Sequence, residues 1–528
     1  MPSVQRLLAG VAMAGALAWG AASPAVAENV LRWGAHRDIV SLDPYSYGDT
    51  FTISVLAHAY EGLVRYNEKL EIEPSLATSW EVLSPSVWRF HLREGVKFHN
   101  GNDFTAEDVL ASFTRVSDPA SPLRGNLPAY KSAKIVDDHT IDVEITDNYP
   151  LLLNDLTNIV IFDKDWLIAN NAEKPTDFGK GVEGYATNHA NGTGPFEIVE
   201  RKPDAQTVFV KNPNWWDKPR HNIDKIIFTP IASPATRVAA MLSGEIDFTN
   251  NAPLQDLPRL QASPDLKVLA SNELRTMFFL FNWADTLQDD PSAKNPLLDK
   301  RVREALYRAI DIDSLQKKVM RGLSRNTGSM VAPAIPGYVP ALDERLAYDP
   351  DKAKALLAEA GHPDGFPFAF VCTNDGYIND EQICQAVAAM WARIGLKPKI
   401  DIAPDSQQTA KFESGRFDVG ILGWANEPML DSYSILVQVV HSKSGTAGVF
   451  NWGGWNLEGV DALIEKAGQT VDRTERLGYQ TQALKTAHDD IAFLPLHQQP
   501  MAWAMGNKVA SVLQLSDNKA RHWLTMMQ

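Results

Sequence analysis

The chain has 528 residues, with 45% hydrophobic and 22% charged side chains and a formal net charge of −15. That length suits two or three lobes of about 150 residues each, and the hydrophobic fraction is ample for large cores. An acidic chain without basic clusters argues against nucleic acid and against anionic membrane surfaces as partners.

The first residues have the pattern of an export signal. A short basic start, residues 1–6, leads into an apolar run without charge over residues 7–22. Ala25-Val26-Ala27 then matches the small-x-small pattern that signal peptidase cleaves. The apolar run is shorter than the roughly 18–20 residues that a membrane-spanning helix needs. We therefore expect residues 1–27 to be a signal peptide cleaved after Ala27, and the mature protein to be periplasmic.

Two kinds of segment follow along the chain. The first kind is rich in strands, because residues 87–92 alternate apolar and polar side chains and residues 135–145 repeat the pattern. The second kind alternates strand and helix, with a buried strand at 368–372, a helix over 380–395 and a strand at 396–402. That order predicts a β-α-β unit with a parallel sheet, so the fold class is α/β with an additional β-rich part.

The chain holds two cysteines, Cys372 and Cys384, whose spacing fits neither a C-x-x-C motif nor a zinc ribbon. In an oxidising compartment an even pair is a disulfide candidate. Cys372 is expected near the end of a strand and Cys384 one turn into the next helix, which can bring their Cβ atoms within bridging distance. Two buried, unreactive thiols are the alternative.

Motifs of catalysis, metal binding and cofactor binding are absent from the sequence. There is no G-x-S-x-G turn, no H-E-x-x-H pair and no glycine fingerprint for a dinucleotide. The twelve histidines include no pair at helical ligand spacing. We therefore expect a protein that is not an enzyme and has no cofactor and no metal. A periplasmic hydrolase is the alternative, because catalytic residues need not be neighbours in the chain.

Residues 348–361 predict a short helix with well-marked ends. Asp349 can cap the first turn, Pro350 suits the first helical position, and Gly361 can end the helix in a left-handed conformation. The amino-acid sequence of this segment resembles a segment that recurs in the large extracytoplasmic solute-binding proteins of peptide and nickel ABC importers. That family is known as family 5, or structural cluster C.

The resemblance covers nearly the whole mature chain, and its motifs occur in the order expected for the family. The matching stretches are residues 42–44, 60–63, 76–80, 88–98, 104–109, 192–196, 302–310, 348–361 and 494–496. Residues 377–386, together with both cysteines, resemble a subgroup of the family, which favours the disulfide over two free thiols.

The resemblance implies a bilobal periplasmic-binding-protein fold (type II, cluster C) with an extra β-rich subdomain. The implied segments are 28–71, 191–293 and 498–528 for lobe I, 72–190 for the extra subdomain and 294–497 for lobe II. It also implies a receptor that holds a small solute between its lobes and delivers it to the permease subunits of an ABC importer. We expect a monomer whose solute is a short peptide.

The candidate ligand site begins where residues 417–422, a predicted buried strand, end. Open α/β sheets bind ligands just past the carboxyl ends of their strands. Trp424 stands at that position, so we expect it to form an aromatic wall. Asp431, with Asn426, is expected to supply the polar anchor in lobe II. Tyr45 and Tyr47 are expected to face them from lobe I.

Ligand identity depends on one departure from the family pattern. Peptide-binding relatives hold the ammonium group of the peptide with an aspartate a few residues after a tryptophan, and here that pattern is not intact. Glu427 or Asp431 can take the role, while a cap on a helix beginning near Ser432 is the other hypothesis for Asp431. Opines, glycosides and metal chelates therefore remain alternatives to a peptide. Met277 and His497 complete the candidate ligand-binding residues.

Overall fold

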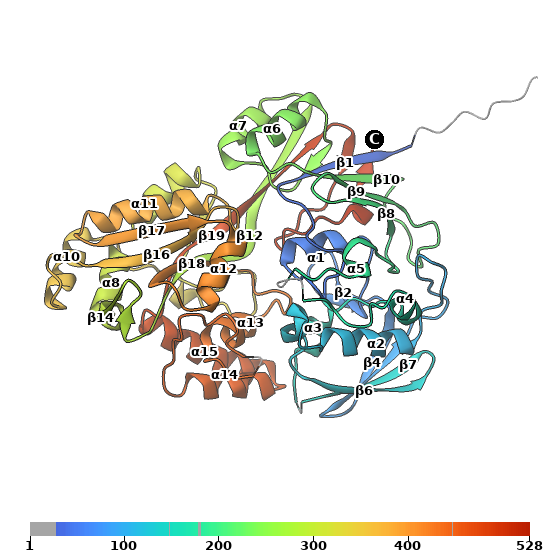
Figure 1. Ribbon diagram of the computed structural model, residues 1–528, viewed down its shortest axis with the longest axis horizontal. Coiled ribbons are helices and arrows are strands. Elements are labelled where there is room, and N and C mark those ends of the chain that lie inside the picture. The colour runs from blue at the N-terminus through green and yellow to red at the C-terminus, as the bar shows by residue number, and fades with distance from the viewer. Residues whose placement is uncertain (1–27, 147, 178–180, 446) are drawn as a thin grey trace, which may run out of the picture.

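The computed structural model describes residues 28–146, 148–177, 181–445 and 447–528, so the predicted signal peptide lies outside the described residues. The chain forms two masses that lie side by side (Figure 1). The long antiparallel strands β12 (Leu266–Phe281) and β19 (Phe493–Gly506) pass from one mass into the other. We call the mass with residues 28–265 and 507–528 lobe I, and the mass with residues 282–492 lobe II. The finer segment boundaries drawn from the sequence stay a prediction.

One sheet runs through both lobes. Its strand order is β17-β16-β18-β12-β19-β11-β1-β10-β9-β8, and β15 pairs with β19 beside this path. The remaining strands of this sheet are β1 (Val30–Ala35), β8 (Phe196–Lys202), β9 (Gln206–Lys211), β10 (Lys225–Pro230), β11 (Phe248–Thr249), β15 (Arg325–Asn326), β16 (Pro367–Thr373), β17 (Lys397–Ala403) and β18 (Val419–Trp424). The register of β12 against β19 shifts between Asn272 and Thr276, which places an irregularity where the strands cross between the lobes.

Lobe II contains the predicted β-α-β unit. Strands β16 and β17 are parallel neighbours, and α11 (Asp380–Ala392) connects them. The helix buries Ile383, Val387 and Trp391, which recur at helical spacing and pack against the sheet. The helix predicted over residues 348–361 is also confirmed, as α10 (Pro350–Glu359). The carboxylate of Asp349 accepts the backbone N–H of Lys352 at its start.

Lobe I carries a separate antiparallel sheet of order β4-β5-β7-β6, which confirms the extra β-rich part (Figure 1). Its strands are β4 (Ala77–Ser84), β5 (Val87–Leu92), β6 (Tyr130–Asp137) and β7 (Thr140–Ile145). In β5, Phe90 and Leu92 are buried while Arg89 binds Asp142 of the neighbouring strand. This alternation is the period of two that one buried sheet face requires. Short pairs elsewhere are β2 (Val64–Tyr66) with β3 (Ile72–Pro74), β13 (Thr286–Leu287) with β14 (Asp290–Lys294), and β20 (Val509–Ser511) with β21 (Met526–Met527).

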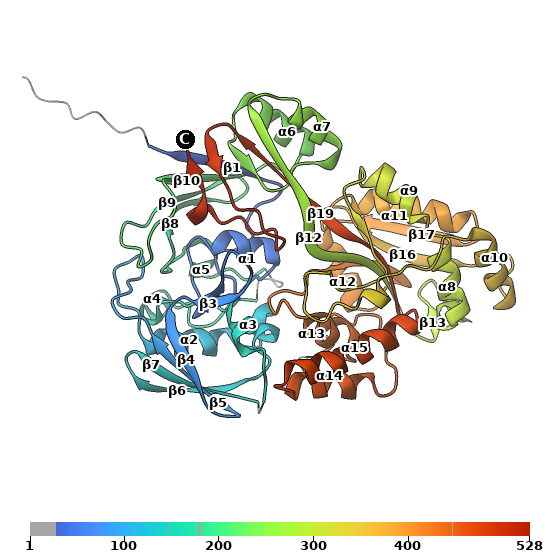
Figure 2. The same cartoon turned by 180° about the vertical axis from the view of Figure 1, so that it is seen from behind.

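Helices cover the sheets of both lobes (Figures 1 and 2). Besides α10 and α11 they are α1 (Thr50–Leu56), α2 (Ala106–Val116), α3 (Leu152–Leu156), α4 (Lys164–Ala169), α5 (Tyr185–Asn188), α6 (Pro234–Ser243), α7 (Leu257–Gln261), α8 (Lys300–Arg308), α9 (Ile312–Ser314), α12 (Asp405–Glu413), α13 (Tyr433–Ile435), α14 (Val460–Gln469) and α15 (Arg473–Asp489). Within the described residues, no helix is both long enough and apolar enough to cross a membrane.

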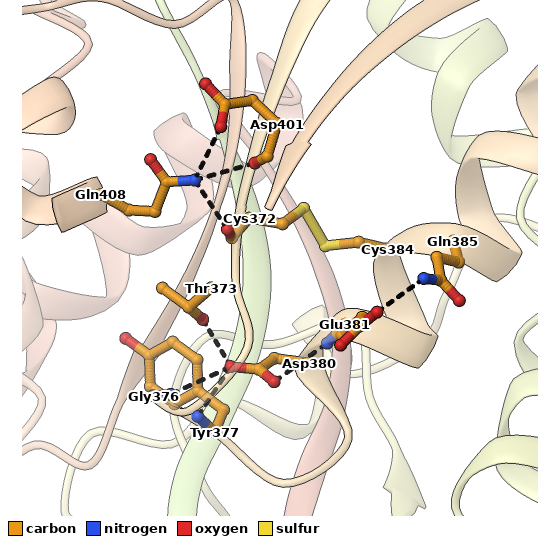
Figure 3. The surroundings of a disulfide bond; sticks show 10 residues. All are labelled: Cys372, Thr373, Gly376, Tyr377, Asp380, Glu381, Cys384, Gln385, Asp401 and Gln408. Carbon is orange, nitrogen blue, oxygen red and sulfur yellow. Dashed lines mark hydrogen bonds between the residues drawn. A yellow bond between two sulfur atoms is a disulfide. The ribbon is translucent and has the colours of Figure 1, made fainter. Parts of the chain in front are cut away.

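A disulfide joins the end of β16 to α11 (Figure 3). Its cysteines are Cys372 and Cys384, whose Cα atoms lie 6.5 Å apart, and both side chains are fully buried. Close by, the carboxylate of Asp380 accepts hydrogen bonds from the hydroxyl of Thr373 and from the N–H groups of Gly376 and Tyr377. The bridge and this carboxylate together fix the loop that follows β16.

Candidate ligand site between the lobes

The carboxyl ends of β16, β17 and β18 meet at one edge of the lobe II sheet, because these strands run parallel. Each strand delivers a polar or aromatic side chain just past its end: Tyr377 after β16, Asp405 after β17, and Asn426 after β18. Such an edge is where open α/β sheets bind ligands.

That edge faces lobe I, and the lobes touch there. The hydroxyl of Tyr66 donates to the carbonyl oxygen of Pro428 over 2.7 Å, and the Asn154 amide donates to the carbonyl oxygen of Met429 over 2.7 Å. Lys519 Nζ lies 2.7 Å from Glu427 Oε2. The loop after β18 is therefore held to lobe I by backbone and side-chain contacts.

Charged groups from both lobes meet at Asp405. Burial raises the pKa of the Asp405 carboxyl and the nearby Asp375 adds to the rise, while Arg37 of lobe I opposes it. Arg37 also hydrogen-bonds to Asp49. Burial, followed by the charge of Asp49, raises the pKa of Tyr47 as well. A solute that enters here meets charges of both signs.

A second polar group lies where β12 crosses between the lobes. Arg275 Nε donates to Glu273 Oε1 over 2.6 Å, and a terminal nitrogen of its guanidinium donates to the carbonyl oxygen of Gly423 over 3.0 Å. The guanidinium carbon stands 5.7 Å from the ring centre of Tyr377, whose pKa burial raises to about 12. The charge of Arg275 also reaches Glu427 and favours its ionised form. This group therefore borders the loop after β18.

The loop after β18 contains buried polar atoms that no described residue binds. The side chain of Asn426 is fully buried, its φ is +58°, and neither its amide oxygen nor its amide nitrogen has a hydrogen-bond partner among the described residues. Glu427 Oε1 is also buried and has no such partner among them, and burial raises the pKa of this carboxyl. A bound ligand is one way to satisfy such groups, because leaving them bare costs free energy.

Asp431, predicted to be the anchor, is saturated by neighbours within lobe II. Its carboxylate accepts hydrogen bonds from Arg476 over 3.2 Å, from the Gln480 amide over 2.8 Å and from the N–H of Tyr433 over 2.9 Å. The last contact lies at the start of α13, whose N-cap residue is Ser432, and a capping role for Asp431 stays a prediction. Trp424 packs edge-on against Phe450, and its ring N–H donates to the Ser434 hydroxyl over 3.1 Å.

The other predicted residues lie in different surroundings. Tyr45 is fully buried in lobe I, and its hydroxyl donates to the carbonyl oxygen of Val160 over 2.6 Å. Met277 and His497 are paired across β12 and β19 and are buried in the lobe II core. Burial and the charge of Arg345 lower the pKa of His497 to about 3. Their part in ligand binding stays a prediction, and the structure gives Tyr45 and Met277 packing contacts.

Sequence reasoning did not find Tyr377, Asp405, Arg275 or the lobe I residues Tyr66 and Lys519. The signal for Tyr377 and Asp405 was present, since both stand just past predicted strands. The rule that selected Trp424 applies equally to those strand ends. The contacts of Tyr66 and Lys519 with the loop after β18 bring together residues far apart in the sequence, so no local pattern reveals them.

Comparison with known proteins decides the family. The model of bacterial extracellular solute-binding proteins, family 5, matches residues 71–447. The chain belongs to this family. It is 28% identical over 462 residues to heme-binding protein A of Haemophilus influenzae, an alignment covering 83% of this chain and 81% of that protein. It is 27% identical over 470 residues to the glutathione-binding protein GsiB of Escherichia coli K12, with 86% and 85% covered.

Solved structures show the same fold. The periplasmic binding protein DppA of Helicobacter pylori, in complex with the peptide STSA, superposes with a TM-score of 0.80 at 25% identity, covering 95% of this chain and 98% of that one. The binding protein MoaA of A. tumefacien R10, in complex with mannopinic acid, superposes with a TM-score of 0.80 at 25% identity, covering 95% and 100%. The α/β bilobal fold of cluster C predicted from the sequence is therefore confirmed. The protein is an extracytoplasmic solute receptor of an ABC importer and not an enzyme.

Proposed function

We propose that this receptor captures a short peptide between lobe I and lobe II in the periplasm and delivers it to the permease of its importer. The observation that carries the proposal is the loop after β18, where Asn426 and Glu427 hold buried polar atoms that no described residue binds. Because this loop contacts lobe I, a solute bound at the loop would be enclosed when the two lobes close.

Glu427 suits the terminal ammonium group of a peptide. A buried ammonium needs a carboxylate partner, because an unpaired charge away from water is costly. One oxygen of Glu427 is held by Lys519, and the other is buried and without a partner among the described residues. Of the two acidic residues that the sequence offered for this role, Glu427 is the one with an oxygen to spare, because Asp431 already has three donors. Relatives that bind glutathione and the peptide STSA support the peptide class.

The test begins with mass spectrometry of whatever copurifies with the protein and leaves it on gentle denaturation. A peptide found this way is then titrated calorimetrically into the wild type, into Glu427→Gln and into Asp431→Asn. We expect Glu427→Gln to weaken binding by about 2–5 kcal/mol, since the ammonium loses its carboxylate. The N-acetylated peptide should bind wild type as weakly as the free peptide binds Glu427→Gln.

Asp431→Asn is the matched control. Its carboxylate is turned toward Arg476 and Gln480, so the affinity for the peptide should stay within a few-fold of wild type. Equal affinity of wild type and Glu427→Gln for the free peptide, together with tolerance of N-acetylation, would contradict the role of Glu427. Loss of binding in Asp431→Asn alone would show that Asp431, and not Glu427, binds the ammonium group.

An opine is the second candidate solute. The observation that favours it is the 25% identical structure in complex with mannopinic acid, whose overlap with this chain equals that of the peptide complex. Titration with mannopinic acid, and its competition with any copurified peptide, separates the two classes. Micromolar binding of the opine without binding of peptides would decide for it.

We also propose that the mature receptor is a monomer that begins at Glu28, after removal of residues 1–27. The intact mass of protein taken from the periplasm and light scattering of the purified sample test the two statements. A mature chain starting elsewhere, or a mass of two chains in solution, would contradict them.

A further inference from the structure

A cavity of about 130 Å³ lies in lobe I and opens at its surface beside the exposed Glu68 and Arg220. Its walls come from the region of α1 and β2, from the loop after α3, and from the C-terminal segment 517–524, and none of its lining residues belongs to lobe II. The C-terminal segment runs down beside α1 in both views (Figures 1 and 2). The cavity is therefore bounded on one side by the last residues of the chain.

Aromatic and aliphatic side chains make up much of the wall. The rings are those of Tyr60, Tyr66, Trp215 and Trp523, and aliphatic groups such as Ile53 stand beside them. An apolar cavity of about 150 Å³ in another protein admits benzene, so a volume of this size is suited to one aromatic ring.

The charged side chains of the wall already have partners of opposite sign. Arg65 pairs with Glu73 over 2.8 Å, and Arg521 pairs with Asp517 over 2.5 Å. Lys519 is paired with Glu427 of lobe II. A charged occupant would have to displace one of these pairs or remain without a counter-ion, which is costly in a buried place. An uncharged occupant meets no such cost.

Two hydroxyl groups of the wall, those of Ser75 and Tyr60, have no hydrogen-bond partner among the described residues. The side chain of Ser75 is fully buried. A hydroxyl can both donate and accept one hydrogen bond, so it complements a ligand that carries a hydroxyl of its own. Such a bond would remove the cost of leaving this group bare in the interior.

We propose that this cavity is a second binding site, separate from the site between the lobes, and that it takes an uncharged single-ring phenol. The ring lies among the aromatic side chains, and its hydroxyl bonds with Ser75. The lining residues all belong to lobe I, and two of them, Tyr66 and Lys519, also contact the loop after β18.

The probe is 4-fluorophenol, observed by fluorine NMR on the full mature chain. We expect saturable binding to wild type with a dissociation constant below about 1 mM, which is within reach of so small a ligand. Ala57 lines the cavity, and Ala57→Leu should fill part of it and weaken binding at least tenfold. The same change in an exposed helical position of lobe II, Ala358→Leu on α10, should leave binding as in wild type.

Two further measurements keep the test decisive if Ala57→Leu fails to fold. Ser75→Ala should weaken 4-fluorophenol severalfold and leave fluorobenzene, which has no hydroxyl, unchanged. Absence of saturable binding to wild type would mean that the cavity holds water only. Wild-type affinity of Ser75→Ala for 4-fluorophenol would also overturn the proposal.

Discussion

Within a single loop of lobe II, neighbouring polar side chains differ in whether the protein itself satisfies them. Asp431 and Arg476 form a buried ion pair with side-chain exposures of 4% and 9%, and Gln480 completes the contacts of the carboxylate. Asn426 and Glu427, four or five residues earlier, keep polar atoms without a described partner. The first group holds the loop in shape, and the second leaves hydrogen-bonding capacity for a ligand.

This difference predicts that Asp431→Ala destabilises the protein strongly. The change would leave Arg476 as a buried charge without its carboxylate, which costs about 3–5 kcal/mol. Loss of the helix cap alone would cost about 1 kcal/mol. Chemical denaturation monitored by far-ultraviolet circular dichroism distinguishes the two values. Glu458→Ala, at an exposed position of the same lobe, serves as the control and should change stability little.

Among the elements, the connection between β16 and α11 is the most constrained part of lobe II. The disulfide joins its two ends, and the carboxylate of Asp380 accepts four hydrogen bonds there (Figure 3). Tyr377, whose ring lies under the guanidinium of Arg275, stands in this loop. The bridge therefore supports a side chain at the edge that faces lobe I.

We expect removal of this bridge to lower the free energy of unfolding by about 2–3 kcal/mol, since a short loop is no longer closed in the unfolded chain. The variant carries Cys372→Ala and Cys384→Ala together. Guanidinium melts with and without reductant provide the internal control, because reductant should destabilise wild type and leave the variant unchanged. Identical melts of wild type and variant without reductant would contradict a stabilising role.

At the same scale the sequence predicted some elements and missed others for physical reasons. The β-α-β unit was predictable because strand and helix each bury a periodic apolar face. The length of β12 was not, because polar residues such as Asn272, Glu273 and Arg275 interrupt its apolar pattern where the strand leaves one lobe for the other. Of the three strand ends at the site, the sequence predicted only the one that carries Trp424. The contacts of lobe I with the loop after β18 join residues far apart in the chain, so no local pattern predicts them.

Across the whole molecule, a group of buried histidines ties the chain ends of lobe I together. His58 Nε2 accepts the backbone N–H of His522 over 3.2 Å, while the other ring nitrogen lies 2.9 Å from the carbonyl oxygen of Val55. Both contacts require a neutral ring with its proton on Nδ1. Burial above all, and also the charges of Arg521 and His221, lower the pKa of His58 to about 4. Burial also lowers the pKa of His221 to about 4.

Stability should therefore fall in mild acid. Well above pH 6.5 these rings are neutral in the folded and the unfolded chain, so they make no pH-dependent difference there. Between about pH 6.5 and 4 the unfolded chain takes up protons that the folded chain refuses, which lowers the free energy of unfolding by up to about 3 kcal/mol for His58. Urea melts at several pH values measure the slope.

His58→Gln is the informative variant, because its amide oxygen can still accept the N–H of His522 and its side chain does not titrate. The free energy of unfolding should fall less steeply between pH 6.5 and 4 in this variant than in wild type. The other buried histidines account for the pH dependence that remains. Parallel curves for the two proteins over that range would show that His58 does not contribute.

The passage of β19 back into lobe I has a consequence for the order in which the chain is made. Strand β11 pairs with β19, and the amide of Asn222 contacts the backbone of Met527 almost at the end of the chain. Lobe I holds the first described residues, yet its sheet and its histidine contacts are completed only by residues 493–528. A nascent chain stalled before residue 493 can therefore finish neither lobe, because β19 also pairs with β12 and β15 in lobe II. The half of the protein that is made first therefore closes only after residues 493–528 have been made.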